Sequence, residues 1–158
     1  MLFWPFDRLK VLLQRVSSAE VAVAGERIAG IGRGLMLLVG FGAGDDQSVL
    51  PGMARRVAQL RVFPDQRGRL HHSVLEIDGG VLAVPQFTLY ANLDRGRRPE
   101  FTAAMAPEPA SRLFDAFVEE LAACGIREIA SGRFGAHMAV ALCNDGPVTL
   151  MLEREPAT

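Results

Sequence analysis

The sequence predicts an α+β domain in which mixed or antiparallel β-sheets form the core and two main helices accompany them. Short apolar runs bounded by glycine, serine and charged residues recur along the chain, as strands do, whereas only two stretches show helical spacing. The length of 158 residues is enough for one domain with a substantial core and too short for two ordinary domains.

The first third of the chain predicts four strands. The segment LMLLVGF is apolar on both faces, as expected of a central strand that is covered on both sides. The four strands are expected at 10–16, 19–25, 26–31 and 34–42.

Two helices are predicted farther along the chain. The first runs from about Ser48 to Leu60, because Pro51 is tolerated only in the first turn of a helix. The second spans 107–125, where apolar residues recur at helical spacing and Gly125 provides the stop. Candidate caps of the first helix are Asp45, Asp46 and Ser48.

The remaining segments predict short strands. These are a short strand with a turn at 64–68, a strand at 79–91 that contains Pro85, and three strands at 127–131, 137–143 and 148–153. Asn144-Asp145-Gly146-Pro147 separates the last two strands. Asn-Asp-Gly alone would close a tight hairpin, and the added proline removes a backbone donor. The corner is therefore either a rigid turn or a stretch of backbone held in a fixed direction for chemistry.

The composition limits the class of function. A formal net charge of −1 excludes a nucleic-acid binder that works by bulk positive charge, but not one with a local basic patch. The two cysteines, Cys124 and Cys143, are too few for a disulfide framework and are expected to be buried thiols in a reducing compartment. No apolar run reaches the length of a membrane span, and the opening residues do not form a signal peptide. We therefore expect a cytoplasmic protein without membrane partners.

The sequence contains no recognisable metal site and no phosphate-binding loop. His71 and His72 are adjacent and would point to opposite faces of a strand, and no histidine or cysteine spacing matches a metal site. We read these two and His137 as surface or partly buried structural residues, and we expect neither a metal nor a cofactor. No glycine-rich phosphate loop opens a helix.

Two short motifs remain, PQFTL at 85–89 and NDGPVT at 144–149. In the first, Gln86 and Thr88 would share one face of a strand, but a lone threonine is a poor nucleophile without an adjacent base. In the second, Asn144 and Thr149 flank the corner. Taken alone, each motif is more often structural than functional.

The motifs and their surroundings resemble the D-aminoacyl-tRNA deacylase family. The matching segments, in the family's order and spacing, are LKVLLQRVSSAEVAV, GLMLLVGFGAGDD, LRVF, PQFTL, GRRPEFT and SGRFGAHMAVALCNDGPVTL. They cover the chain from Leu9 to Glu153, and the two motifs are specific when they occur together at this distance. The resemblance implies the barrel-like fold of that family.

The resemblance also implies an activity and a site. A homodimer would hydrolyse the ester that joins a D-amino acid, or glycine, to the 3′-terminal ribose of tRNA. Its active sites would lie at the subunit interface and bind the acceptor end. The catalytic segment would comprise Gln86, Phe87 and Thr88, and the partner subunit would contribute Gly146 and Pro147. Supporting residues would be Asn144, Thr149 and Arg15.

In this family the Gly-Pro bond is cis, a geometry that proline makes accessible at about 0.5–1 kcal/mol. The carbonyl oxygens of Gly146 and Pro147 would then point into the partner's pocket, accept hydrogen bonds from the substrate ammonium and exclude an L-side chain. Backbone N–H groups near Phe87 would stabilise the oxyanion, and the 2′-hydroxyl of the substrate would activate water. Thr88 would position the substrate and would not attack it.

The sequence departs from the family at several places. Pro85 replaces the family's usual serine, so any role of that hydroxyl is absent here. A related animal branch that edits L-alanyl-tRNA also has Pro-Gln at this place, but Phe87 and NDGPVT agree better with the D-specific group. A catalytically inactive dimeric tRNA-binding module is a further alternative.

Two segments add expectations of their own. Residues 1–8 precede the start of related proteins and are expected to be an extension, either a disordered arm or a misassigned start, ahead of a single domain at 9–158. The loop DRGRRPEF contains Arg95, Arg97 and Arg98, which either form a solvated surface or contact tRNA phosphates.

Overall fold

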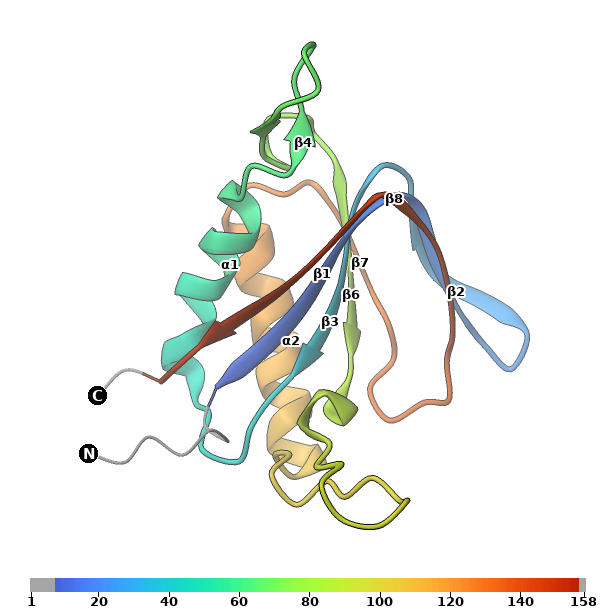
Figure 1. Cartoon of the computed structure of the whole chain (residues 1–158), viewed down its shortest axis with the longest axis vertical. Coiled ribbons are helices and arrows are strands. Elements are labelled where there is room, and N and C mark those ends of the chain that lie inside the picture. The colour runs from blue at the N-terminus through green and yellow to red at the C-terminus, as the bar shows by residue number, and fades with distance from the viewer. Residues whose placement is uncertain (1–7, 157–158) are drawn as a thin grey trace.

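The computed structural model describes residues 8–156 and arranges them as a six-stranded mixed sheet, a small separate hairpin and two helices that pack side by side against the sheet (Figure 1). This arrangement confirms the predicted α+β class with two main helices. None of the helices within residues 8–156 is long and apolar enough to span a membrane.

The sheet is built around β1 (Leu9–Val23). One edge of β1 pairs first with β3 (Gly34–Gly40) and then with β2 (Glu26–Ile31), and its other edge pairs with β8 (Ala139–Arg154), all antiparallel. β3 continues the sheet through two parallel pairings, with β6 (Gly80–Pro85) and then β7 (Glu128–Ser131). Because β2 and β7 approach each other, the sheet is nearly closed, as the barrel-like prediction required.

Two pairs of predicted strands are each a single strand. Segments 10–16 and 19–25 form the continuous β1, which changes partner from β3 to β2 at the exposed Ser17 and Ser18. Segments 137–143 and 148–153 form most of β8, both halves of which pair with β1 in the same direction. The Gly-Pro corner is therefore an excursion within one strand, and the prediction of two separate strands on either side of it is wrong.

The helices confirm the patterns that predicted them. The 3-10 turn η1 (Gln47–Val49) precedes α1 (Leu50–Gln59), and the Asp46 carboxylate accepts the Ser48 backbone N–H at 2.8 Å. Pro51 lies in the first turn of α1, as expected. α2 spans Pro107–Ala123. Apolar side chains of α1 and α2 pack with those of the sheet to form the larger core cluster, which includes the fully buried Phe63, Phe114, Phe117 and Leu121.

The strand predicted at 79–91 is shorter than expected. β6 ends at Pro85, and residues Phe87–Tyr90 form the 3-10 helix η2. The last backbone hydrogen bond from this segment to the sheet is donated by the Gln86 N–H to the Val39 carbonyl at 2.7 Å. The Leu89 N–H then donates to the Gln86 carbonyl at 3.3 Å, which forms the first turn of η2. This turn packs closely against Gly40, which has no side chain. A Cβ at that position would lie only 2.8 Å from the Gln86 oxygen.

A small hairpin projects from one end of the molecule, at the top of Figure 1. It consists of β4 (Phe63–Pro64) and β5 (Leu70–His72), and it confirms the turn predicted around 64–68. At the opposite end, the loop that follows η2 runs from 91 to 106.

The two cysteines and the N-terminal extension were also predicted from the sequence. Cys124 is half-buried at the end of α2, but Cys143 is exposed, so the prediction of two buried thiols is wrong for Cys143. Cys143 lies on β8, which pairs with no described strand other than β1 and leaves alternate side chains uncovered. The predicted extension at 1–8 lies outside the described residues except for Arg8, whose guanidinium pairs with Glu153 at 3.3 Å and Glu155 at 2.6 Å.

Candidate active site

The Gly-Pro corner is a four-residue excursion from β8. Val16 of β1 pairs with Asn144 and Gln14 pairs with Thr149, so residues 145–148 stand opposite the single residue Arg15. Gly146–Pro147 is a cis peptide bond, and Gly146 has a φ of +129°, a conformation that favours glycine. Asp145, Gly146 and Pro147 are exposed. The corner thus lies at the solvent-exposed surface of the described chain.

Arg15 fixes the corner from below. This side chain is buried at 8% exposure, and its Nε donates to the Asp145 carbonyl at 3.0 Å. Its Nη1 donates to the Val62 carbonyl at 2.7 Å, and the Asp145 carboxylate lies 3.5 Å from Nε. A Cβ on Gly146 would lie 2.9 Å from Nη2, so the guanidinium fills the space under that residue.

Asn144 and Thr149 close the neck of the corner. The Asn144 amide donates to the carbonyls of Arg15 at 3.3 Å and Val148 at 3.2 Å. The Thr149 hydroxyl donates to Asn144 Oδ1 at 3.4 Å. These contacts place both residues around the excursion, and their supporting role in the site stays a prediction.

The first motif lies at the end of β6. The Gln86 amide donates to the Thr88 hydroxyl in a close hydrogen bond, so the two side chains meet although they do not share a strand face. The Phe87 ring is 55% exposed and meets the Phe101 ring edge-to-face at 5.0 Å between centroids. Within residues 8–156, the backbone N–H groups of Phe87 and Thr88 have no hydrogen-bond acceptor. Two free donors therefore lie beside the Gln86–Thr88 pair.

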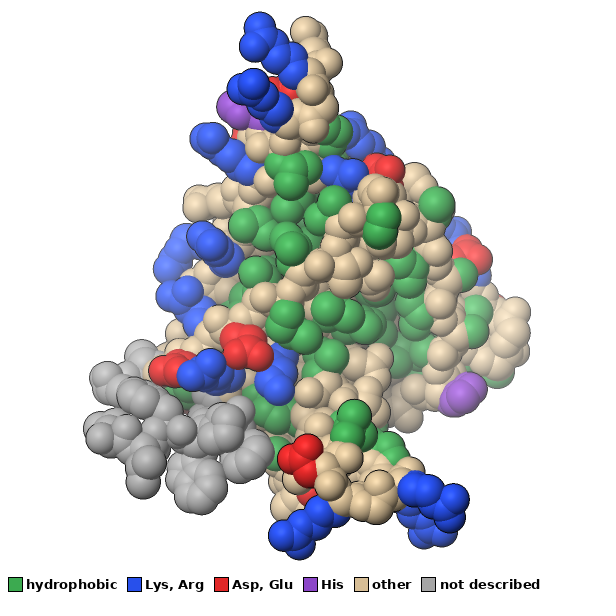
Figure 2. Space-filling model, in the orientation of Figure 1, with side chains coloured by type: hydrophobic (Ala, Val, Ile, Leu, Met, Phe, Trp, Pro, Cys, Tyr) green, Lys and Arg blue, Asp and Glu red, His purple; other side chains and the backbone are tan. Residues whose placement is uncertain are grey.

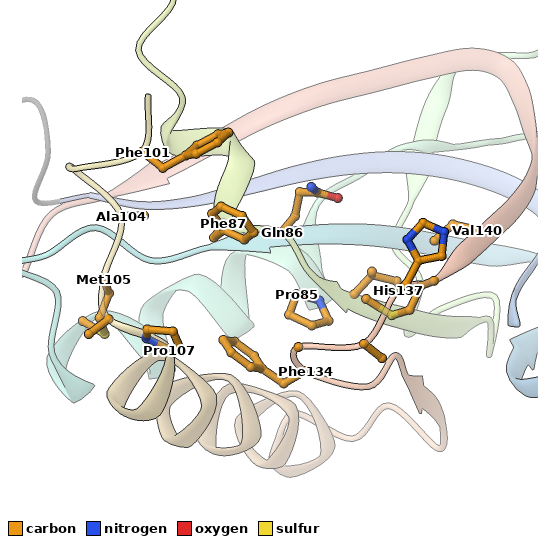
Figure 3. Close-up of a pocket in the computed structure, with 15 residues that line it drawn as sticks. Pro85, Gln86, Phe87, Phe101, Ala104, Met105, Pro107, Phe134, His137 and Val140 are labelled. Atoms are coloured by element: carbon orange, nitrogen blue, oxygen red, sulfur yellow. The ribbon is translucent and has the colours of Figure 1, made fainter. Parts of the chain in front are cut away.

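A cavity of about 560 Å³ opens beside this motif (Figure 3). Pro85, Phe134, Met105 and Pro107 surround it, and His137 lies on its far side. The wall combines the end of β6, the start of α2 and the loop that leads into β8, so three segments far apart in the sequence meet here.

Most of these cavity residues were not identified from the sequence as site residues. Phe134 and Met105 lie in irregular segments without hydrophobic periodicity, so no pattern distinguished them from other loop residues. His137 is exposed on the cavity wall, and His72 lies 3.3 Å from the Glu76 carboxylate. No group of three or more potential metal-ligating side chains occurs in the part of the chain that the structure describes.

The two motifs do not meet within one chain. Arg15 is level with Leu35 of β3, which is level with Val81 of β6, whereas Pro85 lies four residues farther along β6. Three strand spacings also separate β8 from β6. At about 3.3 Å per residue and about 4.8 Å between strands, the corner and Gln86 are about 20 Å apart. A single small substrate group cannot touch both within one protomer.

Solved structures share this fold. A structure described as "c-Myc DNA Unwinding Element Binding Protein" superposes with a TM-score of 0.86 at 41% identity, covering 94% of this chain and 99% of that one. A structure described as a probable eukaryotic D-amino acid tRNA deacylase superposes with a TM-score of 0.82, covering 93% and 100% of the two chains. At 19% identity, the second likeness shows the fold alone.

Residues 12–153 match the family model described as D-Tyr-tRNA(Tyr) deacylase, and the chain belongs to that family. A protein of Thermomicrobium roseum named D-aminoacyl-tRNA deacylase is 49% identical over 145 residues, which cover 92% of this chain and 94% of that protein. A protein of the same name from Roseiflexus castenholzii is 49% identical over 152 residues, covering 94% and 96%.

Proposed function

We propose that the protein is a hydrolase that cleaves the ester bond of D-aminoacyl-tRNA and releases the free D-amino acid and tRNA. Glycine on a non-cognate tRNA would be cleaved in the same way. Membership of the deacylase family and the names of the relatives support this activity. The observation that carries it is the exposed corner of Gly146 and Pro147, held by the buried Arg15. Charged tRNA as the substrate favours a cytoplasmic location.

The active site is assembled from two protomers of a homodimer. Within one chain the corner lies about 20 Å from Gln86, so a partner must bring the second half of the site. β8 pairs with β1 and carries exposed apolar side chains. Of these, Leu150 is 39% exposed and Met151 is 47% exposed. A two-fold interface makes reciprocal contacts, so it would complete both sites at once.

The corner acts as the chirality filter. The carbonyl oxygens of Gly146 and Pro147 accept hydrogen bonds from the substrate ammonium and occupy the space that an L-side chain would need. A hydrogen atom or a D-side chain points away from them. Because backbone atoms exclude the L-configuration, the filter does not depend on which side chain the substrate has. The bond from Arg15 to the Asp145 carbonyl keeps these oxygens in place.

The chemistry falls to the first motif and to the tRNA itself. Water attacks the ester carbonyl carbon, the carbonyl π electrons move onto its oxygen, and the free N–H groups of Phe87 and Thr88 hydrogen-bond this oxyanion. One such donor is typically worth about 2.7–4 kcal/mol. The intermediate collapses, the bond to the 3′ oxygen breaks, and that oxygen takes a proton. The neighbouring 2′-hydroxyl orients the water and relays its proton.

Thr88 positions the substrate. Its hydroxyl oxygen accepts a hydrogen bond from the Gln86 amide, which has no basic lone pair with which to remove the hydroxyl proton. The apolar cavity beside the motif has the size and the aromatic lining to hold the terminal base of the tRNA, with Phe134 on its wall.

The decisive assay compares the hydrolysis of D- and L-aminoacyl-tRNA pairs by the native protein and by Gly146→Ala. We expect the native protein to cleave the D-ester and to leave the L-ester intact. In the variant, the new Cβ meets Arg15 and the φ of +129° is unfavourable, so D-activity falls and discrimination weakens. Equal cleavage of both esters by the native protein would refute the chirality filter.

Two alternative functions are each supported by one specific observation. Pro85 at the end of β6 favours an editing deacylase for L-alanyl-tRNA, and parallel assays with D-Tyr-tRNA and L-Ala-tRNA separate the two enzymes. The likeness to a protein described as binding a DNA unwinding element favours a non-catalytic nucleic-acid-binding module. Such a module would bind tRNA without hydrolysing any ester.

A further inference from the structure

The segment around the β4–β5 hairpin is the most basic part of the chain. Residues 55–72 contain five arginines and one carboxylate, a formal charge of +4 in a chain whose total is −1. The arginines are Arg55, Arg56, Arg61, Arg67 and Arg69. Positive charge is therefore concentrated here and outweighed by acidic residues elsewhere.

These five arginines are exposed, and within residues 8–156 none of them forms an ion pair. Elsewhere the arginines are mixed, because Arg27, Arg112 and Arg127 each pair with a carboxylate, whereas Arg33, Arg133 and Arg154 form no ion pair within the described residues. Unpaired guanidinium groups remain available for an external anion, and arginine binds phosphate with two parallel hydrogen bonds.

The tip of the hairpin is ordered by its single carboxylate. Asp65 Oδ1 accepts the backbone N–H groups of Arg67 at 2.8 Å and Arg69 at 2.9 Å. The bond from Arg69 is the main reason why the pKa of Asp65 is below its ordinary value. Asp65 therefore stabilises the turn and leaves the side chains of both arginines free.

The base of the hairpin is linked to the Gly-Pro corner through the Arg15 side chain. Arg15 donates to the Asp145 carbonyl of the corner and to the Val62 carbonyl, and β4 begins at the next residue. The Val62 N–H in turn donates to the His72 carbonyl of β5 at 3.1 Å. One buried guanidinium thus fixes the position of the hairpin relative to the corner.

A second group of free arginines adjoins the other half of the site. Arg95, Arg97 and Arg98 lie in the loop after η2, are exposed, and form no ion pair within the described residues. Backbone bonds between Asn92 and Glu100 close this loop beside the contact of Phe87 with Phe101. Figure 2 shows Lys and Arg side chains at both places, over the hairpin and over the loop at the opposite end.

We infer that the hairpin of one protomer and the 91–106 loop of its partner bind phosphates of the same tRNA acceptor arm. This inference rests on the proposed function, in which the corner of one protomer meets the first motif of the other. Bringing those two motifs together also brings the hairpin of one protomer and the loop of the other to the same active site. The ligand is the tRNA backbone, and the hairpin arginines Arg67 and Arg69 supply the contacts from the corner side.

The test compares three double variants on two substrates. Arg67→Ala/Arg69→Ala removes the hairpin charges, Arg97→Ala/Arg98→Ala removes the loop charges, and Arg112→Ala/Arg127→Ala removes equal charge from other surfaces. The substrates are D-tyrosyl-tRNA and D-tyrosine esterified to the 3′ oxygen of adenosine, which lacks the phosphate chain.

We expect the hairpin and loop variants to lower the ratio of kcat/KM for the tRNA to kcat/KM for the short ester by about tenfold or more. The slope of log kcat/KM for the tRNA against log salt should become shallower by about 2, because each lost phosphate contact removes about 0.9. The matched control should change neither quantity appreciably.

An unchanged ratio and salt slope in the hairpin variant would overturn the inference, as would an equal loss on both substrates. Failure of the native protein on the short ester and on the tRNA would instead overturn the proposed function. In that case, filter binding of uncharged tRNA still decides the inference, because the hairpin variant should bind more weakly than the matched control.

Discussion

At the scale of single residues, Arg15 is the side chain that holds the Gly-Pro corner in place. A charged side chain in a strand is expected to face solvent, yet Arg15 is buried and both of its hydrogen bonds go to backbone carbonyls far away in sequence. Its partners, Asp145 and Val62, belong to the corner and to the base of the hairpin. The resemblance to the deacylase family pointed to Arg15, but local pattern alone could not, because its role depends on contacts made only after folding.

Replacing Arg15 with lysine should therefore affect the corner and stability together. Lysine keeps the charge but lacks the planar fork, so at least one carbonyl loses its partner. We expect the free energy of unfolding to fall by about 1–3 kcal/mol and deacylation of D-aminoacyl-tRNA to fall about tenfold or more. Denaturant unfolding and initial rates measure these quantities. Arg27→Lys, at an exposed ion pair with Glu20, should change stability by less than about 1 kcal/mol, and equal effects of the two variants would contradict the account.

Thr88 provides the second test at this scale. Thr88→Ala should retain measurable deacylation, because the hydroxyl accepts a bond from Gln86 and has no base beside it. Mass spectrometry of the native protein quenched during turnover should show no acyl group on Thr88. A trapped acyl-Thr88 species would establish covalent catalysis and disprove the positioning role.

At the scale of elements, periodic patterns predicted single helices and strands but not the features that depend on contacts between elements. α2 and the buried β3 were predicted from the spacing of apolar residues, which one element determines by itself. The continuity of β8 through the corner depends on pairing with β1, and the turn of η2 depends on packing against Gly40. Such long-range contacts produce no periodic pattern in the sequence. The prediction therefore divided β8 into two strands at the corner and extended the β6 strand to residue 91.

The position of η2 can be tested through Gly40. A Cβ at this residue would lie 2.8 Å from the Gln86 carbonyl and 3.2 Å from Leu89 Cβ, so Gly40→Ala should displace η2. We expect a loss of about 1–3 kcal/mol in stability, together with a marked loss of deacylation.

Gly32→Ala is the matched control, because a Cβ there would meet no atom within 4 Å. This variant should keep its activity and its midpoint of thermal unfolding close to the native values. Full activity of Gly40→Ala would show that the position of η2 does not matter for the site.

At the scale of the whole molecule, the single chain holds the two motifs at a distance from each other. The first motif and its cavity lie at the end of β6, and the corner lies across the sheet on β8. The sequence resemblance implied a shared site, and the distance within one chain gives this implication a geometric reason. Exposed apolar side chains on β8, such as Leu150 and Met151, supply a surface that a partner can cover.

Subunit complementation tests this arrangement most directly. One variant, Gln86→Ala/Thr88→Ala, has a defective first motif, and a second, Pro147→Ala, has a defective corner. The two are mixed, dissociated and reassembled, and deacylation of D-aminoacyl-tRNA is measured against each parent treated alone. If every site takes its two motifs from different protomers, each mixed dimer contains one intact site, and random assembly should restore about a quarter of native activity. A mixture no more active than the average of its parents would contradict a site shared between protomers.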